Sequence, residues 1–363
     1  MKKSILFTFV LCLLSQWSVA QAPKWVEKAK RSVFSIVTYD KDDKIQNTGN
    51  GFFVTEDGVA LSDYSLFKGA QRAVIINSEG EKMPVECILG ANDMYDIIKF
   101  RVGITVKKVP ALQVAALAPA VGAEVYLLPY STQKGGNVTR GKVKKVDNIG
   151  GDKYHYYTLD MVLKDKMVSC PVTTADGKVF GVAQKSSGQD TASISYAAGA
   201  AFAMSQNISA LALSDPALNA IGIKKGLPED EDQALVYLFI ASTQSTPEAY
   251  AIALDDFIKT FPNSADGYLR RAGNYVFADK DENHMDKAAA DLHNPAWQKE
   301  YLLPTAGRRV NSEWQSHSVH SPEPYHTSSL YKQFRVYSID NCISAWLCYN
   351  RYRLSSALPK RRS

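Results

Sequence analysis

Short β-type runs separated by turn residues fill the chain from about residue 30 to about residue 210. Examples are SVFSIVTY, GFFVT, VALS, RAVIIN, IIKFRV, EVYLLPY, YHYYTLDMVL, KVFGVAQ and AAFAM. Turn signals such as Glu56-Asp57-Gly58, Ser78-Glu79-Gly80 and Asp176-Gly177 fall between the runs. Many short strands at close spacing predict an all-β barrel or sandwich. The length suffices for two six-stranded barrels within one domain.

The hydrophobic period changes from about residue 229. Apolar residues then recur at helical intervals, at Tyr250, Ala253, Leu254, Phe257, Ile258 and Phe261. Thr246 is a suitable helix N-cap, Pro247 suits the first turn, and Pro262 ends the helix. A second run with Tyr268, Ala272 and Tyr275 follows. The pattern predicts antiparallel helices over 229–292, joined to the β-domain (23–213) by a linker at 214–228.

This helical region resembles the tetratricopeptide repeat. Ala253, Phe257 and Pro262 lie at matching positions, and the later MDKAAADL fits the same pattern. One and a half units are visible, fewer than the three that such arrays usually need. An ordinary helical hairpin is the alternative.

The first 22 residues have the pattern of a secretory signal peptide. Lys2 and Lys3 precede the apolar run 5–14, and small residues end at Ala20 or Ala22. Cys12 lies inside the apolar run, which disfavours lipid attachment there. We therefore predict export, to the periplasm or outside the cell. No later apolar stretch has the roughly 20 residues needed to cross a bilayer, so no membrane span is expected after cleavage.

The segment 293–363 has a different composition. It holds three of the five Trp, four of the six His, and ten Lys and Arg against four Asp and Glu. No apolar periodicity is sustained there. A poorly ordered tail, an out-of-frame extension and a small domain remain as alternatives.

Charge and cysteine usage exclude several classes of function. The excess of basic residues lies in the two ends, so 23–292 carries a formal charge of about −3, and no nucleic-acid partner is indicated. Cys87 and Cys170 lie in the β-domain, as two buried thiols or as a disulfide that export would permit. No metal-ligand spacing or phosphate-binding loop occurs, so no metal and no cofactor is predicted.

Four motifs in order resemble the HtrA/Deg-type trypsin-like serine proteases. They are GNGFFVTEDGVALSDYSLFKGA (49–70), GANDMYDIIKFRV (90–102), VTRGKVKKV (138–146) and YYTLDMVLKDKMVSCPV (156–172). GAAFAM (199–204) also resembles a strand that lines the family's substrate cleft. The resemblance covers most of 30–210 and implies a double β-barrel.

The resemblance assigns the family's catalytic positions by ungapped counting. The His falls on Ser65, the Asp on Asp96 and the nucleophilic Ser on Val168, while Lys166 replaces the oxyanion-loop Gly. Val168 has no nucleophilic atom, and a hydroxyl at position 65 cannot act as the general base. Lys166 lacks the conformational freedom of Gly at the oxyanion turn. The pattern indicates a degenerate triad in a protease-like fold.

Two residues that follow Val168, Ser169 and Cys170, are alternative nucleophiles. Ser169 lies one residue beyond the family's nucleophile, and Lys166 would be its base. Cys170 is intrinsically more nucleophilic, but no His matches a place beside it. His155 lies in a strand-like run and is expected to be structural.

Two functions remain. The first is an exported pseudo-protease that binds a peptide or protein together with a helical-repeat scaffold. The second is an active serine endopeptidase with a displaced nucleophile such as Ser169. Tyrosines are frequent in the β-domain and suit either a ligand surface or half-buried strands, namely Tyr126, Tyr130, Tyr154, Tyr156, Tyr157 and Tyr196. The sequence leaves the oligomeric state and the identity of the partner open.

Overall fold

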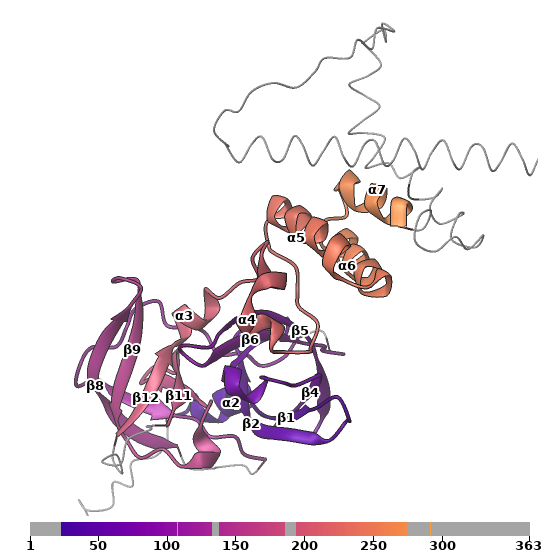
Figure 1. Cartoon of the computed structure of the whole chain (residues 1–363). Helices are drawn as coiled ribbons and strands as arrows, with labels where there is room; N and C mark the ends of the chain where they lie inside the picture. The colour runs from indigo at the N-terminus through magenta and orange to yellow at the C-terminus, as the bar shows by residue number, and fades with distance from the viewer. Residues whose placement is uncertain (1–22, 107, 133–137, 186–193, 275–290, 292–363) are drawn as a thin grey trace, which may run out of the picture. The chain divides into compact units, whose positions relative to one another are not determined.

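The computed structural model describes residues 23–106, 108–132, 138–185, 194–274 and 291 (Figure 1). The chain divides into two compact units. The first extends to Ile208 and includes 214–226, and the second comprises 209–213 and the chain from Leu227. The predicted signal peptide (1–22) and the predicted tail (293–363) lie outside the described residues, as does most of 275–292.

Six antiparallel strands close the first barrel, in the order β1-β2-β3-β6-β5-β4. They are β1 (Val33–Tyr39), β2 (Ile45–Phe53), β3 (Val59–Ser62), β4 (Arg72–Ile76), β5 (Lys82–Asn92) and β6 (Ile97–Val102). In β5 the side chains alternate between exposed and buried from Lys82 to Cys87, as expected of a strand with one face toward a core. The β2–β3 turn has Gly58 at φ +95°, a conformation that favours glycine.

A second closed barrel follows, in the order β10-β11-β12-β9-β8-β7. Its strands are β7 (Glu124–Leu127), β8 (Thr139–Ile149), β9 (Tyr154–Asp160), β10 (Pro171–Thr174), β11 (Val179–Gln184) and β12 (Ile194–Gly199). The prediction of two six-stranded barrels is therefore confirmed. The predicted turn at Asp176-Gly177 joins β10 to β11, with Gly177 at φ +83°.

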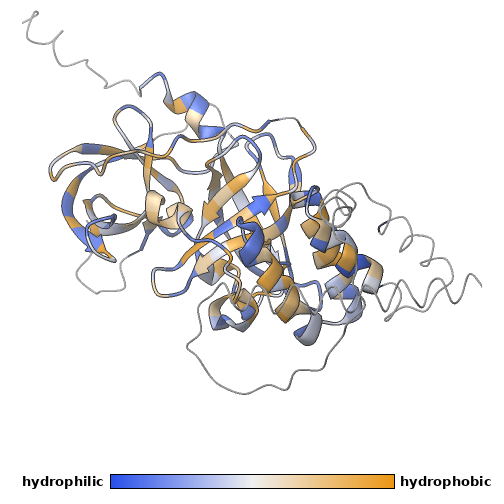
Figure 2. Cartoon of the chain, turned by 90° about the horizontal axis from the view of Figure 1, so that it is seen from above, coloured by the Kyte–Doolittle hydropathy of each residue, from blue (hydrophilic) through white to orange (hydrophobic). Residues whose placement is uncertain are grey.

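One hydrophobic cluster spans both barrels. It joins Val33, Phe52 and Leu61 of the first barrel to residues of the second such as Leu127 and Val172, all fully buried. A short helix that precedes β1, α2 (Val26–Lys30), adds Val26 and Ala29 to this cluster. Figure 2 shows hydrophobic segments interspersed with hydrophilic ones along the strands. The two barrels are thus packed as one body.

The structure corrects the expectation that AAFAM forms a strand. β12 ends at Gly199, and Ala200–Met204 forms the helix α3. A short apolar run has no periodicity that distinguishes a buried strand from a buried helix. Alanine and methionine are good helix formers, which explains why the run turns helical once the strand has ended.

Residues 214–226, which fall in the predicted linker, pack against the first barrel. They include the short helix α4 (Pro216–Asn219), capped by Asp215, and follow the 3₁₀ turn η4 (Ala212–Ser214). The Tyr64 hydroxyl donates to the Ala217 carbonyl at 3.1 Å, and the amide of Ile88 donates to the Lys224 carbonyl at 2.8 Å.

The second unit is helical. It contains α5 (Glu231–Gln244), α6 (Pro247–Thr260) and α7 (Ala265–Asn274), and Leu238, Leu254 and Phe257 are fully buried in its core. The predicted limits of α6 are confirmed, since Thr246 Oγ1 caps the amide of Ala249 at 3.3 Å and the helix ends before Pro262. The tetratricopeptide likeness stays a prediction. Within the described residues, no helix combines the length and apolar character needed to cross a membrane.

Candidate functional site

The residue predicted at the base position, Ser65, contacts Asp96 directly. Pairing of Ser62 with Ile98 brings the residues after β3 beside those before β6. Ser65 lies in the 3₁₀ turn η2 (Tyr64–Leu66) that follows β3. Its amide donates to Asp96 Oδ1 at 2.6 Å, and its hydroxyl donates to Oδ2 at 3.0 Å. Both carboxylate oxygens of Asp96 are therefore engaged by a single serine.

Asp96 is held by a turn that the second barrel also contacts. The residue lies between β5 and β6 at φ +50°, an uncommon conformation for a residue other than glycine. Gln184, at the end of β11, donates from Nε2 to the carbonyl of Tyr95 at 2.7 Å. The Tyr156 hydroxyl donates in turn to Gln184 Oε1 at 2.9 Å. This chain of hydrogen bonds fixes Asp96 relative to the second barrel.

The predicted nucleophile position, Val168, follows a 3₁₀ turn, η3 (Asp165–Met167). The amide of Val168 donates to the Asp165 carbonyl at 3.2 Å, which closes the turn. Val168 is half-buried, and Lys166, at the predicted oxyanion position, is exposed. Asn50 of β2 donates from Nδ2 to the carbonyls of Lys166 at 3.1 Å and of Val168 at 2.9 Å. The first barrel thus sets the conformation of this turn.

Ser169, the predicted alternative nucleophile, points into the protein. It has φ +64° and is 1% exposed. Its hydroxyl donates to Asp63 Oδ2 at 2.7 Å, and its amide donates to the Ala183 carbonyl at 2.8 Å. The backbone is left-handed at Ser169 and extended at the preceding residue, Val168.

Asp63 is a buried carboxyl that sequence reasoning missed. Burial raises its pKa well above the usual range, the charge of Asp96 raises it further, and the hydrogen bond from Ser169 opposes the rise. Its second oxygen, Oδ1, has no hydrogen-bond partner among the described residues. A carboxyl in these surroundings favours its neutral form. The only signal in the sequence was an acidic residue directly after the buried strand VALS.

The structure therefore brings the predicted positions to one place. Ser65 contacts Asp96, and Val168 and Ser169 are tied to the segment around β3 through Asn50 and Asp63. Asn50 connects the turn at Val168 to the end of β3, because its carbonyl accepts from the Ser62 hydroxyl at 2.6 Å. Asn50 was also missed as a functional candidate, although it lies within the GNGFF motif.

An aromatic cluster with members from both barrels adjoins this group. Tyr156 stacks on Tyr196 with ring centroids 5.9 Å apart, and Tyr95 lies 6.2 Å from Tyr156. All three rings are half-buried. Burial raises the pKa of Tyr156 to about 12, so its phenol stays protonated at neutral pH. The cluster offers aromatic faces beside Asp96.

Other candidate residues lie elsewhere. His155, the one histidine that the structure describes, is on β9, and its Nδ1 lies 3.2 Å from Asn148 Oδ1. Cys87 and Cys170 are buried thiols outside any disulfide, which confirms the first of the two alternatives for this pair. Burial raises the pKa of Cys170 to about 12, so the reactive thiolate is suppressed. Among the described residues, no three His, Cys, Asp or Glu side chains are grouped to hold a metal ion.

Comparison with known families identifies the barrel unit. Residues 49–182 match the model of the trypsin-like peptidase domain, from within β2 to within β11. No curated protein matches the chain. With two six-stranded barrels observed, the chain contains a trypsin-like peptidase domain.

Proposed function

We propose that this protein is an exported pseudo-protease, of HtrA/Deg type, that binds a peptide or protein. In this proposal the trypsin-like domain has no working Ser-His-Asp triad and acts together with a helical-repeat scaffold. The observation that carries the proposal is the Ser65–Asp96 pair. The carboxylate that would orient a catalytic imidazole instead accepts two hydrogen bonds from a serine.

The nucleophile position supports the same conclusion. Val168 has a hydrocarbon side chain, so no covalent acyl intermediate can form on it. Acyl transfer also needs backbone amides aimed at the developing oxyanion. The amide of Val168 donates within the η3 turn at 3.2 Å, and Asn50 holds the turn in that conformation. Position 168 therefore offers no attacking group, and its backbone amide already donates within the turn instead of to an oxyanion.

One observation favours the second candidate, an endopeptidase with Ser169 as nucleophile. The Ser169 hydroxyl lies 2.7 Å from a carboxyl oxygen of Asp63, within the distance of a nucleophile from its base. Two observations weigh more against it. Ser169 is 1% exposed, and the raised pKa of Asp63 favours a carboxyl that already holds its proton.

The aromatic cluster of Tyr95, Tyr156 and Tyr196 is the proposed peptide-binding surface. Tyrosine rings give a large contact area and lose little conformational entropy on binding. Exposed Ser65 and half-buried Asp96 add polar groups at the edge of the cluster. A surface of this composition suits extended peptide with apolar side chains.

Labelling by a fluorophosphonate tests the absence of catalysis. The mature wild-type protein should show no labelled serine and no peptide hydrolysis above buffer. Labelling that disappears in Ser169→Ala and persists in Val168→Ala would establish the second candidate instead.

Titration with casein-derived peptides tests the binding role. Tyr196→Ala should weaken binding, whereas Tyr39→Ala, which removes a ring that packs against Arg72 on the first barrel, should not. Equal binding by both variants would exclude the aromatic cluster as the peptide site.

A further inference from the structure

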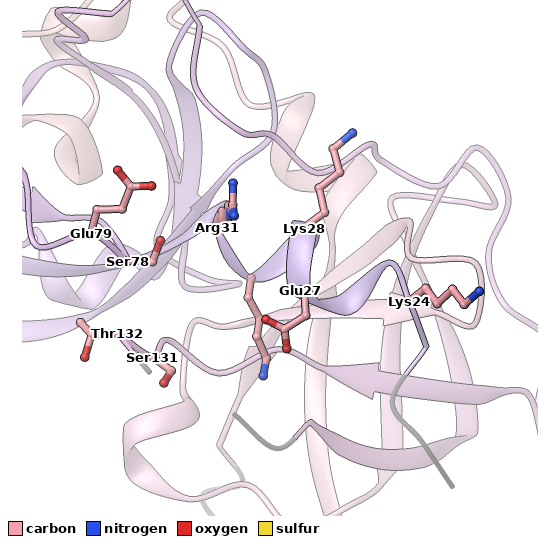
Figure 3. Close-up of a pocket in the computed structure, with 9 residues that line it drawn as sticks. Lys24, Glu27, Lys28, Arg31, Ser78, Glu79, Ser131 and Thr132 are labelled. Carbon is pink, nitrogen blue, oxygen red and sulfur yellow. The ribbon is translucent and has the colours of Figure 1, made fainter. Parts of the chain in front are cut away.

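A polar cleft of about 590 Å³ lies beside α2 (Figure 3). One side is formed by α2 and its flanking residues, which carry Lys28 and Arg31. The rest of the lining consists of Ser78 and Glu79 in the β4–β5 turn and of Ser131 and Thr132, which follow β7. No lining residue belongs to the Ser65–Asp96 group or to the turn at 165–170. The cleft is thus a separate place on the barrel unit.

The cleft has an excess of positive charge. Its charged lining consists of four cationic residues and two anionic ones, namely Lys24, Lys28, Lys30 and Arg31 with Glu27 and Glu79. Within the described ranges, Lys24, Lys28 and Arg31 form no ion pair. Among the described residues, these three exposed cations therefore have no carboxylate within ion-pair distance.

The wall that carries the cations is fixed in place. Trp25 Nε1 donates to the Ala175 carbonyl at 2.9 Å, and the ring meets Tyr126 edge-on at 5.8 Å. The next residue, Val26, is 1% exposed and belongs to the core shared by the barrels. A short helix held at these points fixes the backbone of Lys28 and Arg31, so little backbone ordering is needed on binding.

The hydroxyl-bearing wall is fixed as well. The Tyr130 hydroxyl donates to the Asn77 carbonyl at 3.2 Å, which joins the segment after β7 to the β4–β5 turn. Asn77 Oδ1 accepts from the amides of Glu79 and Glu81, each at 2.9 Å. Ser78 and Ser131 therefore come from segments that are bonded to each other.

We infer that this cleft binds a phosphate monoester of a small, hydroxyl-rich molecule. The dianionic phosphate neutralises the excess positive charge, and Arg31 offers the planar donor pair that suits phosphate oxygens. The volume lies within the range for small-molecule sites and exceeds what a phosphate group alone fills. Glu27 and Glu79 disfavour a ligand that is anionic throughout, but they can accept hydrogen bonds from its hydroxyl groups.

Calorimetric titration of the full mature chain tests this inference. The probes are glucose 6-phosphate, glucose, inorganic phosphate and a Glu-rich peptide, at one fixed ionic strength. Glucose 6-phosphate should bind with a Kd of about 1 mM or tighter, and more tightly than phosphate or glucose. Lys28→Gln and Arg31→Gln should each weaken it about tenfold. Lys41→Gln, in the exposed β1–β2 turn, removes the same charge and should have no effect.

The contrary outcomes are distinct. No binding of glucose 6-phosphate, or equal binding by wild type and both cleft variants, would overturn the inference. Glucose that binds as tightly as its phosphate would also count against it. Tighter binding of the Glu-rich peptide, lost in the same variants, would assign the cleft to acidic protein segments instead. Peptide binding at the aromatic cluster is measured separately, so either proposal can fail alone.

Discussion

The Ser169 hydroxyl donates to Asp63 Oδ2 at 2.7 Å, and this contact joins the two barrels inside the protein. Asp63 follows β3 of the first barrel, and Ser169 precedes β10 of the second. Both residues are almost completely buried. An interior hydrogen bond thus occupies the serine next to Val168, the predicted nucleophile position.

Asp63→Asn should stabilise the protein at alkaline pH. The folded-state pKa of Asp63 is raised above the ordinary value of about 3.9, so the folded protein holds a proton that the unfolded chain has lost. Wild-type stability should therefore decline as pH rises from about 4 toward the folded-state pKa. The neutral amide avoids this loss, and we expect a gain of roughly 1–3 kcal/mol at pH 8. Urea unfolding at pH 4 and pH 8 measures it.

The exposed Asp42→Asn is the matched control, because it removes the same charge at the surface. It should leave the pH profile unchanged. A gain for Asp63→Asn that is as large at pH 4 as at pH 8 would contradict the assignment to Asp63 ionisation.

Asn50→Ala should destabilise the barrel unit by about 1–3 kcal/mol. Asn50 is 8% exposed, and its amide satisfies two carbonyls of the 165–168 turn. Chemical denaturation measures the loss. Asn148→Ala removes an amide that donates to Asp152 on an exposed hairpin, and it should cost less than about 0.5 kcal/mol. A loss of stability for Asn50→Ala no larger than that for Asn148→Ala would show that the hydrogen bonds of Asn50 do not stabilise the fold.

Gly177→Ala should cost more stability than Gly80→Ala. Both glycines have positive φ, +83° and +84°, so alanine meets the same backbone strain at each, on the order of 1 kcal/mol. A Cβ at Gly177 would lie 2.7 Å from the Trp25 ring, whereas nothing lies within 4 Å at Gly80. We expect a further loss of roughly 1–3 kcal/mol at Gly177, measured by thermal unfolding. Equal losses would place the Trp25 ring further from this turn.

Restoring the family's residues should produce weak catalysis. The variant is Ser65→His, Val168→Ser, Lys166→Gly and Ser169→Gly, which places an imidazole beside Asp96 and a hydroxyl at position 168. Glycine also suits the φ of +64° at position 169. We expect fluorophosphonate labelling and slow peptide hydrolysis. The triple variant that keeps Val168 is the control and should stay unlabelled. A quadruple variant as inert as wild type would weigh against a protease-like arrangement of these positions.

The features of the fold that could be predicted from the sequence are those that depend on local residue patterns. Turn residues between short apolar runs indicated the barrels, and Thr246, Pro247 and Pro262 indicated the limits of α6. The prediction of a strand at AAFAM was wrong because an apolar run of that length has no hydrophobic periodicity that distinguishes a strand from a helix. Asp63 and Asn50 were missed for another reason. Their partners lie more than a hundred residues away in the chain, so only the folded structure identifies them.

The common core of the barrels limits how this domain can respond to a ligand. Phe52 and Leu61 on one side and Leu127 and Val172 on the other are buried in a single cluster, so separating the barrels would expose it to water. The junction between the barrels is therefore rigid and does not act as a hinge. Partners must fit a surface that is already formed, and the unit should melt in a single step.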